Sequence, residues 1–274
     1  MSEIKLLHTK RIGIIGTGTM GQALMRGLLA RGLSRQRLLA ADPNPVRRRQ
    51  ASRRFHVSVS DENVRVVKRA AIVILAVKPQ QFPELLAQVA PHLSRRHLVI
   101  SIAAGIRLRW LQERLPGVPL VRVMPNLPAT IGRGFSAIAL GRSAAARHRA
   151  IARAIFEAVG EVVELPERHF DAITAVSGSG PAYVFFLVQA WEEAARSLGL
   201  PPAVAARAIR QTLSGSARLL QASAEPARVL TGKVASKGGT TEAALRVLAK
   251  RRVLAHLVEA IRAAARRSRA LSWG

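Results

Sequence analysis

Three glycines spaced as G-x-G-x-x-G form the part of the sequence best suited to bind a phosphate. The motif is Gly16-Thr17-Gly18-Thr19-Met20-Gly21, and it directly follows the apolar run Arg11–Ile15. Between a strand and a helix, the first glycine allows a tight turn, the second lets backbone approach a pyrophosphate, and the third lets the helix pack on the strand. Free amides at the start of that helix favour an anion. The motif therefore predicts a dinucleotide site.

A second set of residues is expected beside the adenosine ribose of that dinucleotide. Asp42 follows the apolar run Leu38–Ala41, and a carboxylate there accepts hydrogen bonds from a 2′-hydroxyl and repels a 2′-phosphate. Asn44 and the cluster Arg47–Arg49 come next and are suited to bind that phosphate instead. A turn or helix cap is the alternative role for Asp42. The choice between NADH and NADPH therefore stays open.

Two further segments are expected beside the nicotinamide ribose, because ligands of open α/β sheets bind beyond the carboxyl ends of the strands. Turns without a ligand contact are the alternative. The segments are Ala76, Val77, Lys78 and Pro79 after one apolar run, and Ala103, Ala104 and Gly105 after another.

Apolar runs alternate with helical stretches from Arg11 to about Leu140, which predicts a doubly wound, Rossmann-like α/β domain with a parallel sheet. The first helix, Met20–Arg31, is expected to end at Gly32. A short edge strand is expected at Val162–Leu165. The other expected strands are Arg11–Ile15, Leu38–Ala41, Ile72–Val77, Leu98–Ile102, Leu120–Val123 and Phe135–Ala139.

Helical segments take over in the second part of the chain. We therefore expect a dinucleotide-binding domain at residues 1–165 and an all-helical dimerisation domain at residues 166–274, to which the family resemblance described below adds substrate binding. The helix from Ala182 begins apolar on every side and must be surrounded, so a homodimer or larger homo-oligomer is expected. The expected helices are Ala144–Val159, Glu167–Val176, Ala182–Leu198, Pro202–Ala222, Pro226–Val234, Glu242–Leu248 and Val253–Leu271.

The formal net charge is +27, but the basic residues lie in short clusters along the chain and only 4% of the residues are aromatic. Little is left for base stacking, so we expect nonspecific polyanion binding and no specific nucleic-acid partner. Met1–Arg11 lacks the apolar core of a signal peptide, and the apolar stretch Pro181–Val188 is far short of the ~20 residues that span a membrane. A soluble cytoplasmic protein without a membrane partner is expected.

Metal and thiol chemistry find no support in the sequence. There is no cysteine, and the seven histidines have no metal-ligand spacing, so no metal is expected and each histidine is assigned to the surface or a helix end.

Several motifs together make the sequence resemble the pyrroline-5-carboxylate reductase family. They occur in family order over nearly the whole chain, and the last two are far more specific than the glycine motif. They are Gly16–Gly21, Ala76–Pro79, Ser101–Gly105, Val123–Asn126 with Pro128 and Ala129, Asp171–Tyr183, and Val234–Thr241.

The resemblance implies reduction of 1-pyrroline-5-carboxylate to L-proline with NADPH or NADH, the last step of proline biosynthesis. Thr241 matches the catalytic hydroxyl that bonds the imine nitrogen, and Asn63 matches a residue that covers the adenosine. An interlocked helical dimer that builds its site from two subunits is also implied. The loop whose amides hold the substrate carboxylate is matched by Ser236, Lys237, Gly238, Gly239 and Thr240.

The chemistry of these residues agrees with imine reduction. Convergent amides before a helix suit a small carboxylate, and hydride transfer to an imine needs alignment rather than a metal or a nucleophile. Because a threonine hydroxyl is a poor proton donor, we expect Thr241 to orient the imine while the proton comes from solvent or is already on the nitrogen. A tight turn at Ser179 and Gly180 is expected to bring the next helix to the substrate, a structural elbow being the alternative.

Two residues depart from the family pattern: Lys237 stands where proline is common, and Leu127 where threonine is usual. Two other functions stay open. A β-hydroxyacid dehydrogenase-like enzyme is one, although the helix Tyr183–Leu198 has neither the lysine nor the asparagine which that family uses. A noncatalytic, polyanion-binding paralogue is the other, motivated by the charge.

Overall fold

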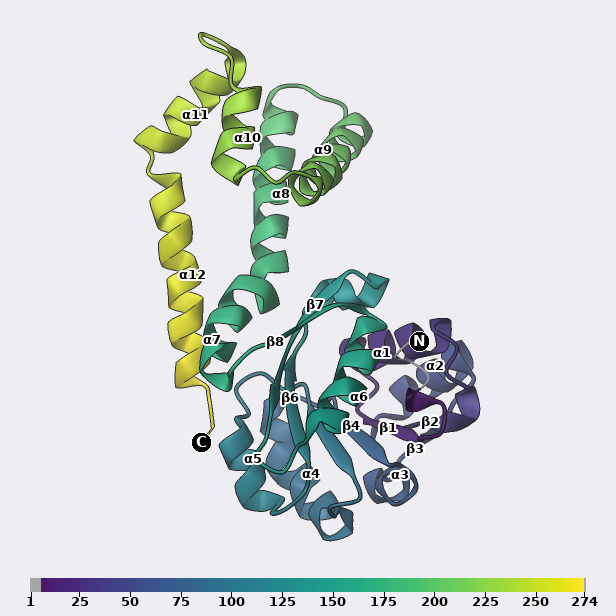
Figure 1. Ribbon diagram of the computed structural model, residues 1–274. Coiled ribbons are helices and arrows are strands. Elements are labelled where there is room, and N and C mark those ends of the chain that lie inside the picture. The colour runs from purple at the N-terminus through teal and green to yellow at the C-terminus, as the bar shows by residue number, and fades with distance from the viewer. Residues whose placement is uncertain (1–5, 274) are drawn as a thin grey trace. The chain divides into compact units, whose positions relative to one another are not determined.

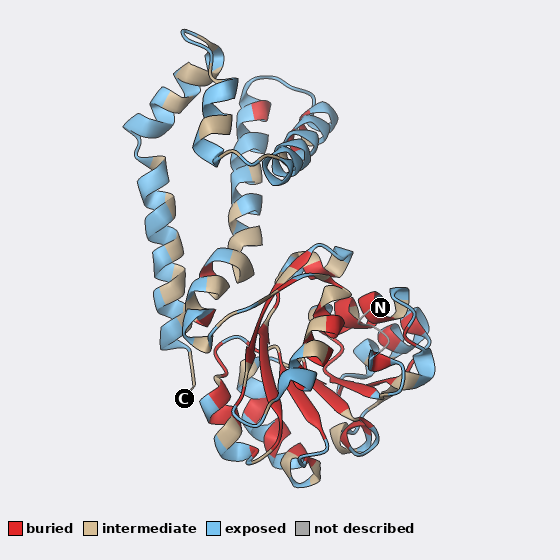
Figure 2. Ribbon diagram, in the orientation of Figure 1, coloured by how far each residue is buried: buried red, intermediate tan, exposed pale blue. Residues whose placement is uncertain are grey.

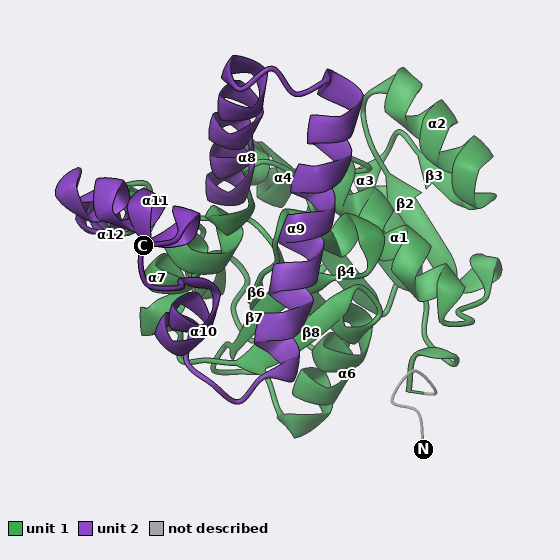
Figure 3. Ribbon diagram, turned by 90° about the horizontal axis from the view of Figure 1, so that it is seen from above, with its two compact units in different colours: residues 1–181, 264–274 green, residues 182–263 purple. Residues whose placement is uncertain are grey.

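The computed structural model describes residues 6–273. The first five residues, part of the Met1–Arg11 segment considered above, lie outside the described residues. The chain forms two compact units (Figure 3). The first consists of Met1–Pro181 with Ala264–Gly274, and the second of Ala182–Ala263.

An eight-stranded sheet forms the centre of the first unit (Figure 1), in the order β3-β2-β1-β4-β5-β6-β7-β8. All neighbouring strands run parallel except the β6–β7 pair. The order of β1 to β6 is that of a doubly wound dinucleotide-binding fold, and its switch point lies between β1 and β4. The strands are β1 Ile12–Ile15, β2 Leu38–Ala41, β3 Ser58–Ser60, β4 Ile72–Leu75, β5 Leu98–Ser101, β6 Leu120–Met124, β7 Gly134–Leu140 and β8 Gly160–Glu164.

Helices cover both faces of this sheet, so every residue of β1, β2, β4 and β5 is buried. Ile14 packs in one core cluster with side chains of α1, α2 and α6, and its neighbour Ile15 packs in another with α3, α4 and α5. The α-helices are α1 Thr19–Ala30, α2 Pro45–Phe55, α3 Asn63–Arg69, α4 Phe82–Val89, α5 Leu108–Arg114, α6 Ala146–Glu157 and α7 Phe170–Ile173. Short 3₁₀ helices are η2 Arg35–Arg37, η3 Pro79–Gln81, η4 Ala90–His92, η5 Leu127–Ile131 and η6 Glu167–His169.

The predicted doubly wound fold is confirmed, with two corrections. The strand β3 was missed, because its three residues are partly exposed and carry no apolar run. The sheet is also not wholly parallel. A parallel pair needs a crossover of about a dozen or more residues, and residues 125–133 between β6 and β7 are too few. The end of the first helix agrees with expectation, since Gly32 has φ +90° and its amide donates to Leu29 O at 3.0 Å.

The tight turn expected at Ser179 and Gly180 is wrong. The chain stays helical from α7 through a π-helix, η7 (Thr174–Gly178), into α8, which begins at Gly180. The amide of Ser179 donates to Thr174 O at 2.8 Å, the longer spacing of a π-helix. Because the helix is continuous, α8 has no free N-terminus at Gly180 for a substrate.

The second unit contains α9 Pro202–Ala222, α10 Ala227–Val234 and α11 Thr240–Lys250, with adjoining parts of α8 Gly180–Ser197 and α12 Val253–Ala270. Most of its residues are exposed (Figure 2). On α8, Val184, Phe185, Phe186 and Trp191 are 43–65% exposed. Burying one such side chain stabilises by about 1.5–3 kcal/mol, so this helix gains several kcal/mol when another surface covers it.

One helical run in the described part, Glu167–Ser197, has the length and composition of a membrane span, with 6% of its most apolar window buried. A single run of this kind is weak support for a membrane role.

Two histidines are buried: His148 lies in the first turn of α6, at a helix end as expected, whereas His97, just before β5, is neither at the surface nor in a helix. His97 is 1% exposed and His148 is 7% exposed. Burial is the main cause that lowers the pKa of both imidazoles below the ordinary value of 6.5.

The free energy of unfolding is expected to decrease as the pH falls below about 6.5, because the unfolded chain then binds protons that folded His97 and His148 resist. Denaturant titrations at about pH 7.5 and about pH 5.5 measure this decrease. The decrease should be smaller in His97→Gln. A stability that rises on acidification, or an equal decrease in wild type and variant, contradicts the assignment.

Candidate functional site

A cleft of about 730 Å³ lies beyond the carboxyl ends of β1, β2, β4 and β5. Ligands of doubly wound sheets bind at this edge. Most residues expected to bind a cofactor line the cleft: Gly16, Thr17, Gly18, Thr19, Met20, Asp42, Asn44, Ala76, Val77, Lys78, Pro79, Ala103 and Ala104.

The three motif glycines differ in their surroundings. Gly16 has φ +101°, and a Cβ there would lie 2.6 Å from Ala76 O. A Cβ on Gly21 would lie 2.1 Å from Gly16 O, so this glycine allows α1 to pack on the turn. At Gly18, no described atom beyond the glycine and its two chain neighbours comes within 4 Å of the Cβ position. The turn is therefore open at Gly18, where a ligand can reach the backbone.

Asp42, which is 2% exposed, holds this turn through its carboxylate. Its Oδ2 accepts hydrogen bonds from Thr17 N at 2.8 Å and Thr17 Oγ1 at 3.0 Å. Its Oδ1 accepts from Asn44 N at 2.9 Å. Asp42 thus connects the end of β2 to the glycine turn, a structural role beside its place in the cleft wall.

The start of α2 forms the next part of the cleft. Asn44 caps this helix, since its Oδ1 accepts from Val46 N and Arg47 N. Arg47 lines the cleft, whereas Arg48 donates from Nη1 to Asp42 O at 3.0 Å and Pro43 O at 2.8 Å. A helix N-terminus and a nearby guanidinium make this end of the cleft favourable for an anion.

Three expected cofactor residues lie outside the cleft lining. Gly21 is packed under the turn. The side-chain Nδ2 of Asn63 donates to Gln88 Oε1 at 3.1 Å, and the Oδ1 of Asn63 is buried without a partner in the described chain. Gly105 has φ +79°, and a Cβ there would lie 3.0 Å from Leu271 O. The absence of a side chain at Gly105 therefore allows the C-terminal segment to pack against this loop.

Sequence reasoning missed several polar and apolar lining residues. Gln22 lies in the first turn of α1 directly after the glycine motif, and Gln50 lies in the middle of α2, and neither residue belongs to a motif. Pro125 belongs to a quoted motif, but its contact with the cleft depends on how β6 ends. The missed residues are Gln22, Pro43, Gln50, Gln81, Ile102 and Pro125.

Asn126 fixes the π-helix from the end of β6. Its Nδ2 donates to Ser177 O at 3.3 Å and to Ser177 Oγ at 3.1 Å, while its Oδ1 accepts from Phe135 N at 2.9 Å. A Cβ on Gly178 would lie 2.6 Å from Met124 Cε, so glycine permits this approach. Two motifs far apart in sequence therefore meet in the first unit.

The loop Ser236–Thr241 lies in the second unit, and its last two residues are the first two of α11. Gly238 has φ +73°, and its amide donates to Glu242 Oε2. The amide of Gly239 donates to Ser236 O at 3.0 Å. Across residues 6–273 no group of three or more His, Asp or Glu residues is placed to hold a metal ion.

Two families match different parts of the chain. Residues 11–105 match the family described as NADP oxidoreductase coenzyme F420-dependent, and residues 167–271 match that described as Pyrroline-5-carboxylate reductase dimerisation. The sheet, the cleft and these matches define a dinucleotide-dependent oxidoreductase with a Rossmann-like domain followed by a helical dimerisation domain.

Individual relatives identify the family. The chain is 40% identical to the pyrroline-5-carboxylate reductase of Synechocystis sp., covering 95% of this chain and 98% of the relative. A pyrroline-5-carboxylate reductase structure from Coxiella burnetii matches at 31% identity and TM-score 0.89, covering 97% and 100% of the two chains. The pyrroline carboxylate reductase structure of Plasmodium falciparum with NADP bound matches at 27% identity and TM-score 0.89, with the same coverage. The protein belongs to the pyrroline-5-carboxylate reductase family, and the resemblance found in its motifs is confirmed.

Proposed function

We propose that the protein reduces 1-pyrroline-5-carboxylate to L-proline with NADPH or NADH, the last step of proline biosynthesis. The observation that carries this proposal is the strand-end cleft with its turn open at Gly18, in a chain that matches a reductase of this family over 95% of its length.

The residues of the cleft fit a dinucleotide. A side chain at Gly18 would occupy cleft space that a pyrophosphate needs, and the start of α1 offers amides to it. Asp42, Asn44 and Arg47 border the place for the adenosine ribose. Ala76–Pro79 and Ala103–Ala104 border the place for the nicotinamide. When bound, the reduced nicotinamide supplies a hydride.

Asp42→Ser is expected to weaken binding of both cofactors and to shift the kcat/KM ratio toward NADPH. Serine cannot replace the bonds to Thr17 and Asn44, and hydrogen bonds to a charged group contribute about 1.5–3 kcal/mol each. The lost charge also no longer repels a 2′-phosphate. Fluorescence titration measures the dissociation constants, and steady-state kinetics with each cofactor measures the ratio. An unchanged ratio would assign Asp42 a structural role alone.

The substrate carboxylate is assigned to the loop Ser236–Thr241. Because the amide of Gly238 already donates to the Glu242 carboxylate of α11 and the amide of Gly239 donates to Ser236 O, the amides of Thr240 and Thr241 are assigned to the anion. Gly239, the N-cap of α11, offers no side-chain acceptor to these amides in the described chain. The positive end of the helix dipole adds to the attraction.

Reduction adds the hydride to the imine carbon, and the ring nitrogen ends with a proton. Thr241 is the side chain assigned to the imine nitrogen, which it orients by a hydrogen bond. Because its hydroxyl is a weak acid, solvent or a previously protonated imine supplies the proton. No metal and no covalent intermediate with the protein are required.

The family match at residues 167–271 supports homo-oligomerisation, and we assign the exposed apolar face of α8 to contact between subunits in a homodimer or larger assembly. A soluble cytoplasmic location belongs to the same proposal, and so does a domain boundary between residues 165 and 166, next to the start of the dimerisation match at residue 167. The compact first unit extends beyond that boundary to Pro181.

An absorbance assay tests the reaction. Purified protein with 1-pyrroline-5-carboxylate and NADPH or NADH is expected to oxidise the cofactor and form an equal amount of L-proline. Salt-sensitive binding of nucleic acid without cofactor oxidation would instead favour a noncatalytic polyanion-binding protein.

A further inference from the structure

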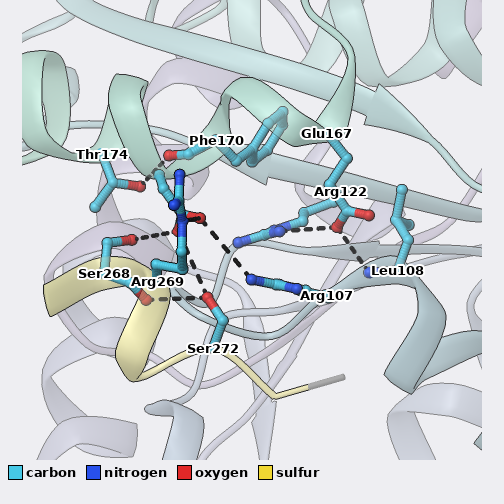
Figure 4. Close-up of polar contacts among 10 residues, drawn as sticks. Arg107, Leu108, Arg122, Glu167, Phe170, Thr174, Ser268, Arg269 and Ser272 are labelled. Atoms are coloured by element: carbon cyan, nitrogen blue, oxygen red, sulfur yellow. Dashed lines mark hydrogen bonds and ion pairs between the residues drawn. The ribbon is translucent and has the colours of Figure 1, made fainter. Parts of the chain in front are cut away.

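A cluster of polar residues outside the cleft lining is not used by the chemistry above. It lies within the first unit, where Figure 4 shows side chains from distant parts of the sequence converging. The cluster consists of Arg107, Arg122, Glu167, Asp171, Ser268, Arg269 and Ser272.

The loop Ile102–Arg107 connects this cluster to the cleft. Its first part, Ile102–Ala104, lines the cleft, and its last residue, Arg107, is the N-cap of α5. A shift of Ile102–Ala104 would therefore change the wall of the cleft.

One side of the loop is held by two carboxylates. Glu167 Oε1 accepts from Leu108 N at 2.8 Å and pairs with Arg122 Nη1 at 2.8 Å. Arg122 is 3% exposed; burial lowers the pKa of its guanidinium, while the bond to Glu167 opposes that shift. Asp171 Oδ2 pairs with Arg107 Nη2 at 3.9 Å.

The C-terminal segment Ser268–Trp273 holds the other side of the loop Ile102–Arg107. The amide of Trp273 donates to Gly105 O at 2.8 Å, and Trp273 O accepts from Arg107 N at 3.3 Å. The Trp273 ring packs on Trp110 of α5, with centroids 5.5 Å apart. The segment Ser268–Trp273 thus adds a short strand-like contact to the loop.

Asp171 joins these two sides. Its Oδ1 accepts from Ser268 Oγ at 2.8 Å and Ser272 Oγ at 3.5 Å, and its Oδ2 also pairs with Arg269 at 3.9 Å. Asp171 lies ten residues before Pro181, the last residue of the first unit before the chain enters the second. Its partners Ser268, Arg269 and Ser272 belong to Ala264–Gly274, the C-terminal segment that is again part of the first unit.

We propose that Asp171 is a positioning residue that fixes the cleft loop Ile102–Arg107 by joining it to the segment Ser268–Trp273. The inference rests on the proposed function, because the loop borders the place assigned to the nicotinamide. Asp171 is not among the residues that line the cleft, and we assign its effect to its contacts with Arg107 and with the segment Ser268–Ser272, which leads to Trp273.

The test compares Asp171→Ala with wild type in three measurements. Amide hydrogen exchange without cofactor is expected to accelerate by at least about tenfold in residues 102–108 but not in β1 or β4. The dissociation constant of NADPH should rise, and the kinetic isotope effect on kcat with 4-deuterated cofactor should increase, because misalignment slows hydride transfer.

Two further variants sharpen the comparison. Asp171→Asn keeps an acceptor for Ser268 without the charge, so its effects should lie between those of Asp171→Ala and wild type. Glu113→Gln removes an exposed carboxylate that pairs with Arg109 on α5 and should behave as wild type in all three measurements. If Asp171→Ala does not fold, Ser268→Ala takes its place with smaller shifts in the same directions.

Loop protection, cofactor affinity and isotope effect all equal to wild type in a folded variant would overturn the proposal. So would a loss of protection spread evenly over the first unit with an unchanged isotope effect, which is the result of a general loss of stability. If wild type does not oxidise NADPH with the imine, the proposed function fails, and the exchange measurement still decides the role of Asp171.

Discussion

Thr241→Ala is expected to reduce kcat by about tenfold to a thousandfold, because it removes the only side chain assigned to the imine nitrogen. The dissociation constant of NADPH should stay within about twofold of wild type, since Thr241 is not among the residues that line the cofactor cleft. Stopped-flow or steady-state kinetics, together with fluorescence titration, separates these two effects.

Two variants control this result. Thr241→Ser keeps the hydroxyl and should recover most of the activity. Thr231→Ala removes an exposed hydroxyl on α10 that donates to Ala227 O at 3.0 Å, and it should leave kcat unchanged. Wild-type turnover in Thr241→Ala would remove the role assigned to this hydroxyl.

Gly18→Val is expected to raise the dissociation constants of NADPH and NADH by at least about tenfold, since the isopropyl group would occupy the place of the pyrophosphate. The fold should tolerate the change. Gly18 has φ −68° and ψ −171°, a conformation open to valine, and no described atom lies near its Cβ position. Titration of each cofactor and a thermal unfolding curve measure the two properties.

Gly21→Ala is the matched comparison within the same motif. Its Cβ would meet Gly16 O at 2.1 Å, so the chain must shift and stability is expected to fall by about 1–3 kcal/mol. The two variants should therefore have different effects: Gly18→Val weakens cofactor binding, and Gly21→Ala lowers the free energy of unfolding. Unchanged cofactor affinity in Gly18→Val would show that the pyrophosphate does not approach this turn.

The sheet and the glycine turn could be predicted because their signals are local. Buried parallel strands appear as continuous apolar runs, and the motif lies where a strand meets a helix. The strand β3 has no such run, and its pairing with β2 depends on the rest of the sheet. The antiparallel β7 follows from a connection of residues 125–133, a length that the apolar pattern alone does not weigh.

The polar network around Asp171 could not be predicted, because its bonds join residues that are about a hundred positions apart, such as Asp171 and Ser268. The π-helix was missed for a related reason. Its glycine and serine residues are typical of a turn, and only the contacts of Asn126 and Met124 with this segment favour a helix. Buried His97 and His148 carry no sequence signal that separates them from surface histidines.

The second unit shows what helix periodicity leaves undetermined. Its helices were predicted with nearly the observed bounds, and the uniformly apolar start of α8 predicted a covering surface. A single chain leaves Phe185 and Phe186 exposed, so the partner surface cannot be derived from one sequence. The net charge of +27 has no explanation in the structure.

Isotope transfer tests the central claim most directly. The protein is incubated with 1-pyrroline-5-carboxylate and NADPH that carries deuterium at the transferred position of C4, and the product is examined by mass spectrometry and NMR. L-proline with one deuterium at C5 is the predicted product. Proline without deuterium, or intact substrate and cofactor after prolonged incubation, would contradict direct hydride transfer to the imine.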